Sequence, residues 1–160
     1  MKQSRKQLWV SMGVLGVVLV VLCVILLGMQ KTPERTAETF LKAAYTAAPE
    51  DYDEFSASLA QNEAAAYFDT RLGGVMTEEA LQTALQNRSL MAGITLAAGA
   101  QAPAKVSGIT LKTVENVGGD KAFDYTATTT AGGTAQALSG RIQLVKDGSA
   151  WKISGFSLQA

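Results

Sequence analysis

The chain has 160 residues, enough for one domain with appendages, and its 14 Lys and Arg residues balance 14 Asp and Glu residues. Three of the cations, Lys2, Arg5 and Lys6, precede the first apolar run, so the rest of the chain is mildly acidic. Such a chain lacks the concentrated basic face that nucleic acid requires. The sequence contains no histidine, which excludes Ser-His-Asp and Cys-His catalysis and histidine-based metal sites.

Residues 8–29 carry no charge and are mostly Val, Leu, Ile and Gly. A helix of this length spans about 33 Å, enough to cross a hydrocarbon core of about 30 Å. The run is longer than the apolar core of a secretory signal peptide and ends without a small-x-small cleavage site. Val21 and Leu22 precede the single cysteine, Cys23, where a lipoprotein signal has small residues. We therefore predict an uncleaved transmembrane helix over 8–29.

The charges that flank this helix indicate its orientation. Three cations lie within the first six residues, and positively charged flanks favour the cytoplasmic side. Cations also follow the helix, so the bias is small, but a long domain is translocated largely regardless of its own charge. The predicted organisation is a cytoplasmic tail 1–7, a transmembrane helix 8–29 and an extracytoplasmic domain 30–160 that contains no cysteine.

The first half of the domain has the spacing and the end signals of helices. Thr32-Pro33-Glu34 is a helix start, because a hydroxyl cap is followed by proline and an acid. Pro49 ends this helix and opens a second, which a stretch over 61–72 is expected to continue with a bend until Gly73-Gly74. Thr77 caps a third helix. The predicted apolar faces are Ala37, Phe40, Leu41, Ala44 and Tyr45 in the first helix, Tyr52, Phe55 and Leu59 in the second, and Ala80, Leu81, Ala84 and Leu85 in the third.

Beyond Ala92 the pattern changes from helix to strand. The Ala- and Gly-rich residues up to Pro103 are expected to form a loop. Four β-rich runs with glycine-containing turns between them follow, over 105–117, 121–130, 134–146 and 150–158. Short turns between consecutive strands dictate an antiparallel meander. Helices followed by a meander predict an α+β fold in which the helices cover one face of a four-stranded antiparallel sheet.

The last strand carries two specific expectations. Gly155 predicts a β-bulge before Phe156. Trp151 lies two residues before Ile153, on the face that must meet the helices. We therefore expect Trp151 to be buried as the chief packing residue of the domain.

The final hairpin reads Lys146-Asp-Gly-Ser-Ala-Trp-Lys-Ile-Ser-Gly-Phe156. A charged residue and glycine before Trp-Lys-Ile, after N-terminal helices, resembles the nuclear transport factor 2-like (cystatin-like) superfamily over roughly 32–158. The resemblance implies a curved sheet that encloses a cone-shaped cavity together with the helices. The implied lining residues are Phe40, Tyr45, Phe55, Tyr67, Phe68, Tyr125, Trp151 and Phe156.

Two interpretations of these aromatic residues stay open, an aromatic core and the lining of an open cavity. Members that resemble steroid isomerases use an Asp base with Tyr and a second acid as donors. Asp69 and Asp124 are the carboxylates that could serve here, but Asp124 alternates with Phe123 and Tyr125 and would face solvent if they point inward. We favour an aromatic core and predict no catalytic residue and no cofactor.

An acidic cluster at 50–54 could suggest a cation site. Glu50, Asp51, Asp53 and Glu54 resemble the start of a Ca²⁺-binding loop, but the Gly at position 6 and the Glu at position 12 are missing. Carboxylates at the beginning of a helix are favoured by its dipole. We therefore interpret them as a solvated helix start and predict no metal site.

The whole layout, a short tail, one transmembrane helix and one extracytoplasmic domain, resembles the inner-membrane assembly factors of type IV secretion and conjugation machines. The resemblance implies a non-enzymatic scaffold or assembly subunit that associates with itself or with other envelope proteins, and the Ala- and Gly-rich composition is typical of bacteria. The alternative is a module, or degenerate enzyme, that holds a small apolar ligand in the cavity. The two differ in whether the cavity is filled by the protein's own side chains.

Overall fold

The computed structural model describes residues 32–114 and 118–159. The predicted tail 1–7 and transmembrane helix 8–29 lie outside these residues. Within the described part of the chain, no helix combines the length and the apolar character needed to cross a membrane. The described residues belong to one folding unit, 31–160, which contains five helices and four strands among them.

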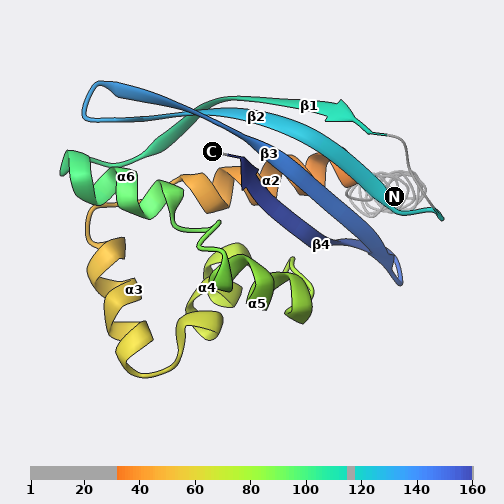
Figure 1. The fold of residues 1–160 in the computed structure, drawn as a ribbon, viewed down its shortest axis with the longest axis horizontal. Coiled ribbons are helices and arrows are strands. Elements are labelled where there is room, and N and C mark those ends of the chain that lie inside the picture. The colour runs from red at the N-terminus through yellow and green to blue at the C-terminus, as the bar shows by residue number, and fades with distance from the viewer. Residues whose placement is uncertain (1–31, 115–117, 160) are drawn as a thin grey trace, which may run out of the picture. The chain divides into compact units, whose positions relative to one another are not determined.

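Helix α2 (Pro33–Tyr45) begins where the sequence predicts, because the Thr32 hydroxyl accepts a hydrogen bond of 3.3 Å from the Arg35 amide. Its predicted apolar face is buried throughout. Phe40 and Tyr45 are its largest buried side chains. The helix packs against all four strands and lies directly against the sheet (Figure 1).

Three short helices follow, α3 (Asp51–Ala60), α4 (Ala64–Leu72) and α5 (Glu78–Gln86). A turn at 61–63 separates α3 from α4, so the bend expected within one helix is a break between two. Gly73 ends α4 in the left-handed conformation, and the Thr77 hydroxyl caps α5, as predicted. The expected apolar face of α3 is only partly buried, since Phe55 is covered whereas Tyr52 and Leu59 are 44% and 52% exposed.

The expected loop at 92–103 is wrong, because most of it forms helix α6 (Ala92–Ala100). No side chain caps the N-terminus of this helix, and its sequence is mainly Ala and Gly, so its local signals are weak. The helix is stabilised by packing. Gly93, Ile94 and Ala97 are buried, and a Cβ atom at Gly93 would lie 2.8 Å from the backbone of Tyr45.

The sheet consists of β1 (Lys105–Thr113), β2 (Lys121–Ala131), β3 (Thr134–Asp147) and β4 (Ala150–Gln159) in the order β1-β2-β3-β4, all antiparallel. The predicted meander is therefore confirmed. Gly132 and Gly133 both have positive φ, as a two-residue type I′ hairpin requires. The predicted bulge in β4 is also confirmed, since the register with β3 shifts between the pairs Gln143–Gly155 and Leu144–Ile153.

The helices lie on one side of a curved sheet, which makes the domain an α+β fold with two layers (Figure 1). Alternate residues of β2 and β3 point into the core, and Ile153 and Phe156 continue it on β4. Trp151 is only partly buried and packs at the edge of the core. The expectation that it is the chief packing residue is wrong, because β4 is an edge strand and Trp151 lies near its beginning.

Candidate functional site

The eight aromatic residues implied as cavity lining fall into two clusters, with Trp151 in neither. The interior cluster lies between the sheet and α2, and the helical cluster joins α3 to α4. The interior cluster consists of Phe40, Tyr45, Tyr125 and Phe156, and the helical cluster consists of Phe55, Tyr67 and Phe68.

The rings of the interior cluster contact one another. Phe156 meets Phe40 edge-on with ring centroids 4.9 Å apart and stacks on Tyr125 at 5.8 Å. The hydroxyl groups of Tyr45 and Tyr125 share a buried hydrogen bond of 2.6 Å, and the Tyr125 hydroxyl also donates to the Ser157 carbonyl at 3.3 Å. These rings fill the space between sheet and helix with side chains of the protein itself.

The two tyrosine hydroxyls of the interior cluster both have hydrogen-bond partners. Burial raises the pKa of Tyr125 to about 12 and raises the pKa of Tyr45 further, so both phenols are neutral at physiological pH. Asp69 is exposed on α4, and Asp124 lies on the outer face of β2, 2.8 Å from Arg141. The structure therefore brings neither carboxylate to the two tyrosines.

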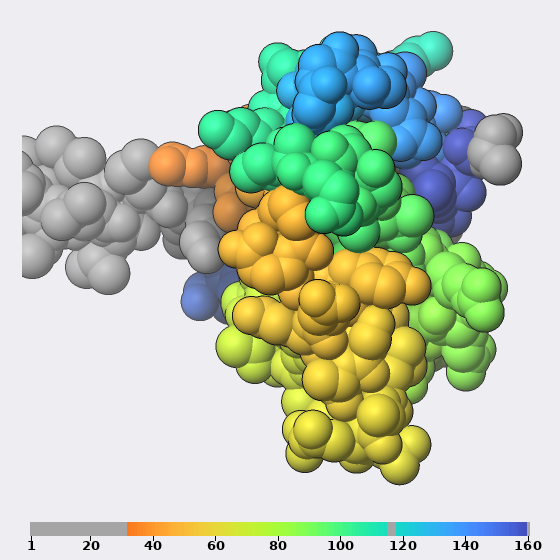
Figure 2. Space-filling model, turned by 90° about the vertical axis from the view of Figure 1, so that its left-hand side faces the viewer, coloured from red at the N-terminus to blue at the C-terminus, as the bar shows by residue number. Residues whose placement is uncertain are grey.

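An apolar groove lies on the outside of the helical layer, between α3, α5 and α6. Its first hollow has a volume of about 410 Å³. Phe55 and Phe68 of the helical cluster line the hollow, and the exposed Tyr52 and Leu59 of α3 also contribute to it. Figure 2 shows α3 in orange and yellow on this side of the molecule, with α6 in green above it. The remaining lining residues are Ser56, Ala84, Leu85, Arg88, Leu90, Met91 and Thr95.

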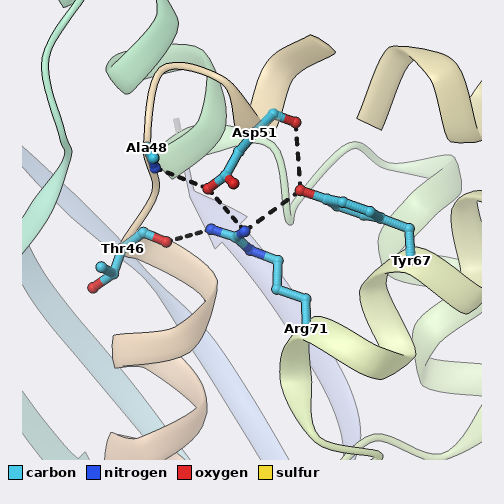
Figure 3. Close-up of polar contacts among 5 residues, drawn as sticks. All are labelled: Thr46, Ala48, Asp51, Tyr67 and Arg71. Atoms are coloured by element: carbon cyan, nitrogen blue, oxygen red, sulfur yellow. Dashed lines mark hydrogen bonds and ion pairs between the residues drawn. The ribbon is translucent and has the colours of Figure 1, made fainter. Parts of the chain in front are cut away.

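A network of polar contacts holds α3 against α4 and α2 (Figure 3). Arg71 of α4 forms an ion pair of 2.8 Å with Asp51 at the start of α3 and donates to the Thr46 carbonyl just after α2. The Asp51 carboxylate also accepts a hydrogen bond of 2.8 Å from the Ala48 amide. The Tyr67 hydroxyl accepts from Arg71 and donates to the Asp51 carbonyl, both at 3.4 Å.

This network serves to position helices. Asp51, Tyr67 and Arg71 contact one another and the backbone, and the Asp51 and Arg71 side chains are only 16% and 18% exposed. Burial raises the pKa of the Tyr67 hydroxyl, which keeps it protonated as a hydrogen-bond donor. By fixing the angle between α3 and α4, these contacts hold one wall of the groove in place.

Sequence reasoning missed the groove for two reasons. Tyr52 and Leu59 belong to a helical apolar stripe that was expected to be buried, and only tertiary packing shows which part of the stripe is covered. Met91 precedes helix α6 and Thr95 lies within it, and the sequence does not signal this helix. Within residues 32–114 and 118–159, no group of His, Cys, Asp or Glu side chains is arranged to hold a metal ion.

The fold and the groove define a class of protein, an α+β domain with an aromatic interior and an apolar surface groove. No family model matches the sequence, and no curated protein is significantly similar to it.

Proposed function

We propose that this chain is a non-enzymatic, membrane-anchored scaffold or assembly subunit of a cell-envelope complex. In this proposal segment 8–29 anchors the chain in the membrane, and the domain, on the extracytoplasmic side, binds another envelope protein through the apolar groove. The anchor rests on the length, composition and flanking charges of segment 8–29.

The observation that carries the proposal is the exposure of Tyr52 and Leu59 beside the groove. Of the large apolar side chains in the described residues, these two are the exposed ones, and they lie on one helix. Grouped apolar surface of this kind marks interaction sites, and Tyr, Phe, Met and Arg are enriched in protein interfaces. The aromatic interior also supports a scaffold, because its rings pack against one another.

Site-specific photo-crosslinking tests this proposal. A photoreactive side chain at position 59 of the full-length protein, expressed in native membranes, should give one discrete crosslinked adduct with another protein. Tyr52→Glu in the same chain should abolish the adduct, because it places a charge in the groove. Position 146, exposed near the β3–β4 hairpin, is the matched control and should give no such adduct. Adducts that form equally from both positions, or none from position 59, would refute the proposal.

A second candidate, a module that holds a small apolar ligand, is favoured by the size of the hollow. Its volume of about 410 Å³ lies within the range of small-molecule sites, roughly 300–1,000 Å³. The apolar dye N-phenyl-1-naphthylamine should then bind the purified protein saturably, and Leu59→Glu should abolish binding. Weak, non-saturable dye fluorescence that Leu59→Glu leaves unchanged would exclude this candidate.

A further inference from the structure

The apolar groove extends beyond its first hollow. A second hollow of about 540 Å³ lies between α6 and the sheet, where Leu158 of β4 and Thr134 and Gln136 of β3 line it. Arg88, Met91 and Thr95 belong to both linings. The two hollows are therefore neighbours that share these residues, and we call the pair, from α3 to the sheet, the trough.

Arg88 is the one charged residue that lines either hollow in the described structure. Its side chain is exposed, and among residues 32–114 and 118–159 it forms no ion pair. Two carboxylates of α3 are directed elsewhere, since Asp51 pairs with Arg71 and Glu54 lines a separate hollow beside Tyr67. Because Arg88 is an unpaired cation between two apolar hollows, a partner with an anionic group at this position would be complementary in charge.

Arg88 follows helix α5 in the left-handed turn that ends the helix. Its φ of +55° is left-handed, a conformation that favours glycine over a side chain with a Cβ atom. Its amide donates to the Leu85 carbonyl at 3.0 Å, and Ser89 and Leu90, which follow it, are buried. The Ser89 amide donates to the Ala84 carbonyl at 2.9 Å, which completes the hydrogen bonding of the helix end. The backbone at Arg88 is therefore held in place, while its side chain is exposed beside both hollows.

The walls of the trough select the form of the occupant. The first hollow is lined by side chains of helices and of the α5–α6 connection, and helical backbone groups are already paired within the helix. The first hollow offers a partner strand no sheet edge, and β3 and β4 line only the second hollow, whose lining does not include Tyr52 or Leu59. A flat lipid surface would not fill a concave hollow. A helix fits, because its apolar residues at i, i+3 or i+4, and i+7 can enter successive hollows.

We infer that the trough binds an amphipathic helix of a partner protein whose apolar stripe is accompanied by an Asp or Glu that pairs with Arg88. The inference rests on the proposed function and deepens it by specifying the chemistry of the partner. Tyr52 and Leu59 contact the apolar stripe at one end, and Met91 and Leu158 contact it further along.

Peptide selection against the full-length protein in lipid nanodiscs tests this inference. The probe is a displayed library of helical peptides of roughly 18 residues, long enough to form four to five turns. Enriched peptides should carry apolar residues at helical spacing and an adjacent Asp or Glu. Leu59→Glu and Arg88→Glu should each weaken their binding at least about tenfold. Both side chains are exposed, so these variants should fold, and thermal melts check this.

A charge reversal gives the sharpest outcome. Selection on the Arg88→Glu protein should replace the acidic residue of the enriched peptides with Lys or Arg. The matched control Lys146→Glu makes the same charge change on exposed β3 and should leave the selected sequences unaltered. Enriched peptides without an acidic preference, equal effects of the two variants, or binding to anionic vesicles in place of peptides would overturn the inference.

The outcomes separate this inference from the proposed function. A crosslinked partner at position 59 combined with no selection of acidic helices would overturn the inference alone. Acidic helices that require Arg88 and Leu59, combined with no adduct in native membranes, would support the binding chemistry and refute the proposed function.

Discussion

The hydroxyl groups of Tyr45 and Tyr125 lie 2.6 Å apart in the interior of the domain, and both residues are at most 2% exposed. Burial is the main cause that raises the pKa of each phenol above its ordinary value of 10.0, to about 12 for Tyr125. The folded state therefore retains these protons at a pH at which the unfolded chain has lost them. A group of this kind contributes stability below the unfolded pKa, and the contribution is lost as the pH rises.

We accordingly expect the free energy of unfolding to fall between pH 10 and about 12, by about 1.4 kcal/mol per pH unit for each tyrosine that titrates only in the unfolded chain. The double variant Tyr45→Phe/Tyr125→Phe removes both hydroxyls without leaving one unpaired. It should show a flatter decline. Denaturant melts at pH 9 to 12 measure both slopes, and equal slopes would show that the pair does not carry the effect.

Trp151 and Phe156 provide a second test at the scale of single residues. Phe156 is 6% exposed and contacts Phe40, Tyr45 and Tyr125, so Phe156→Ala should cost about 3–5 kcal/mol. Trp151 is partly exposed at the edge of the core, so Trp151→Ala should cost less, about 1–2 kcal/mol. Urea melts measure the free energy of unfolding of the two variants. A larger loss of stability for Trp151→Ala than for Phe156→Ala would contradict the placement of Phe156 in the core and of Trp151 at its edge.

At the scale of elements, two glycines in α6 make a matched pair. A Cβ atom at Gly93 would lie 2.8 Å from the Tyr45 backbone, whereas a Cβ atom at Gly99 would meet nothing within 4 Å. Gly93→Ala should therefore push α6 away from α2 and destabilise the domain by about 1–3 kcal/mol. Gly99→Ala should stabilise it by up to about 1 kcal/mol through helix propensity. Thermal melts measure the stability of both variants. Equal effects of Gly93→Ala and Gly99→Ala would mean that close packing does not hold α6 in place.

The contact between α3 and α4 depends on the Arg71–Asp51 ion pair. Arg71→Met should cost about 2–3 kcal/mol, less than a fully buried pair because the side chains keep 18% and 16% exposure. The matched variant Arg141→Met breaks a pair whose side chains are 46% and 44% exposed and should change stability little. A double-mutant cycle with Asp51→Asn isolates the pairwise energy in denaturant melts. No coupling between Arg71 and Asp51 would show that the network does not position the helices.

At the scale of the whole molecule, we expect the fragment 32–160 to fold without segment 8–29. The described residues have one connected core that spans α2 to β4, and the two layers bury their apolar faces against each other. The fragment should be soluble and unfold in one cooperative transition. The full-length protein should remain with the membrane pellet after a salt wash. Recovery of a mature soluble form that begins near Gln30 would contradict the anchor, and aggregation of the fragment would contradict independent folding.

Local sequence signals predicted much of this fold. Thr32 and Thr77 begin helices because their hydroxyls accept hydrogen bonds from free amides, and these signals act within four residues. The strands alternate buried and exposed residues, and glycines such as Gly132 and Gly133 allow turns that few other residues can form. The bulge at Gly155 is also a local feature. Like the helix caps and the glycine turns, it could be predicted from residues that are neighbours along the chain.

Only the tertiary structure decided the remaining features, because they depend on contacts between distant residues. Helix α6 forms where Gly93 lets it approach Tyr45, which lies 48 positions earlier in the chain. The stripe on α3 is covered at Phe55 and open at Leu59 because α4 and α6 shield one part of it. The sequence by itself determined a candidate anchor, an α+β domain and the absence of histidine chemistry. The trough around Arg88 required the packing of α3 to α6 and the sheet, since no local pattern specifies which apolar surface remains uncovered.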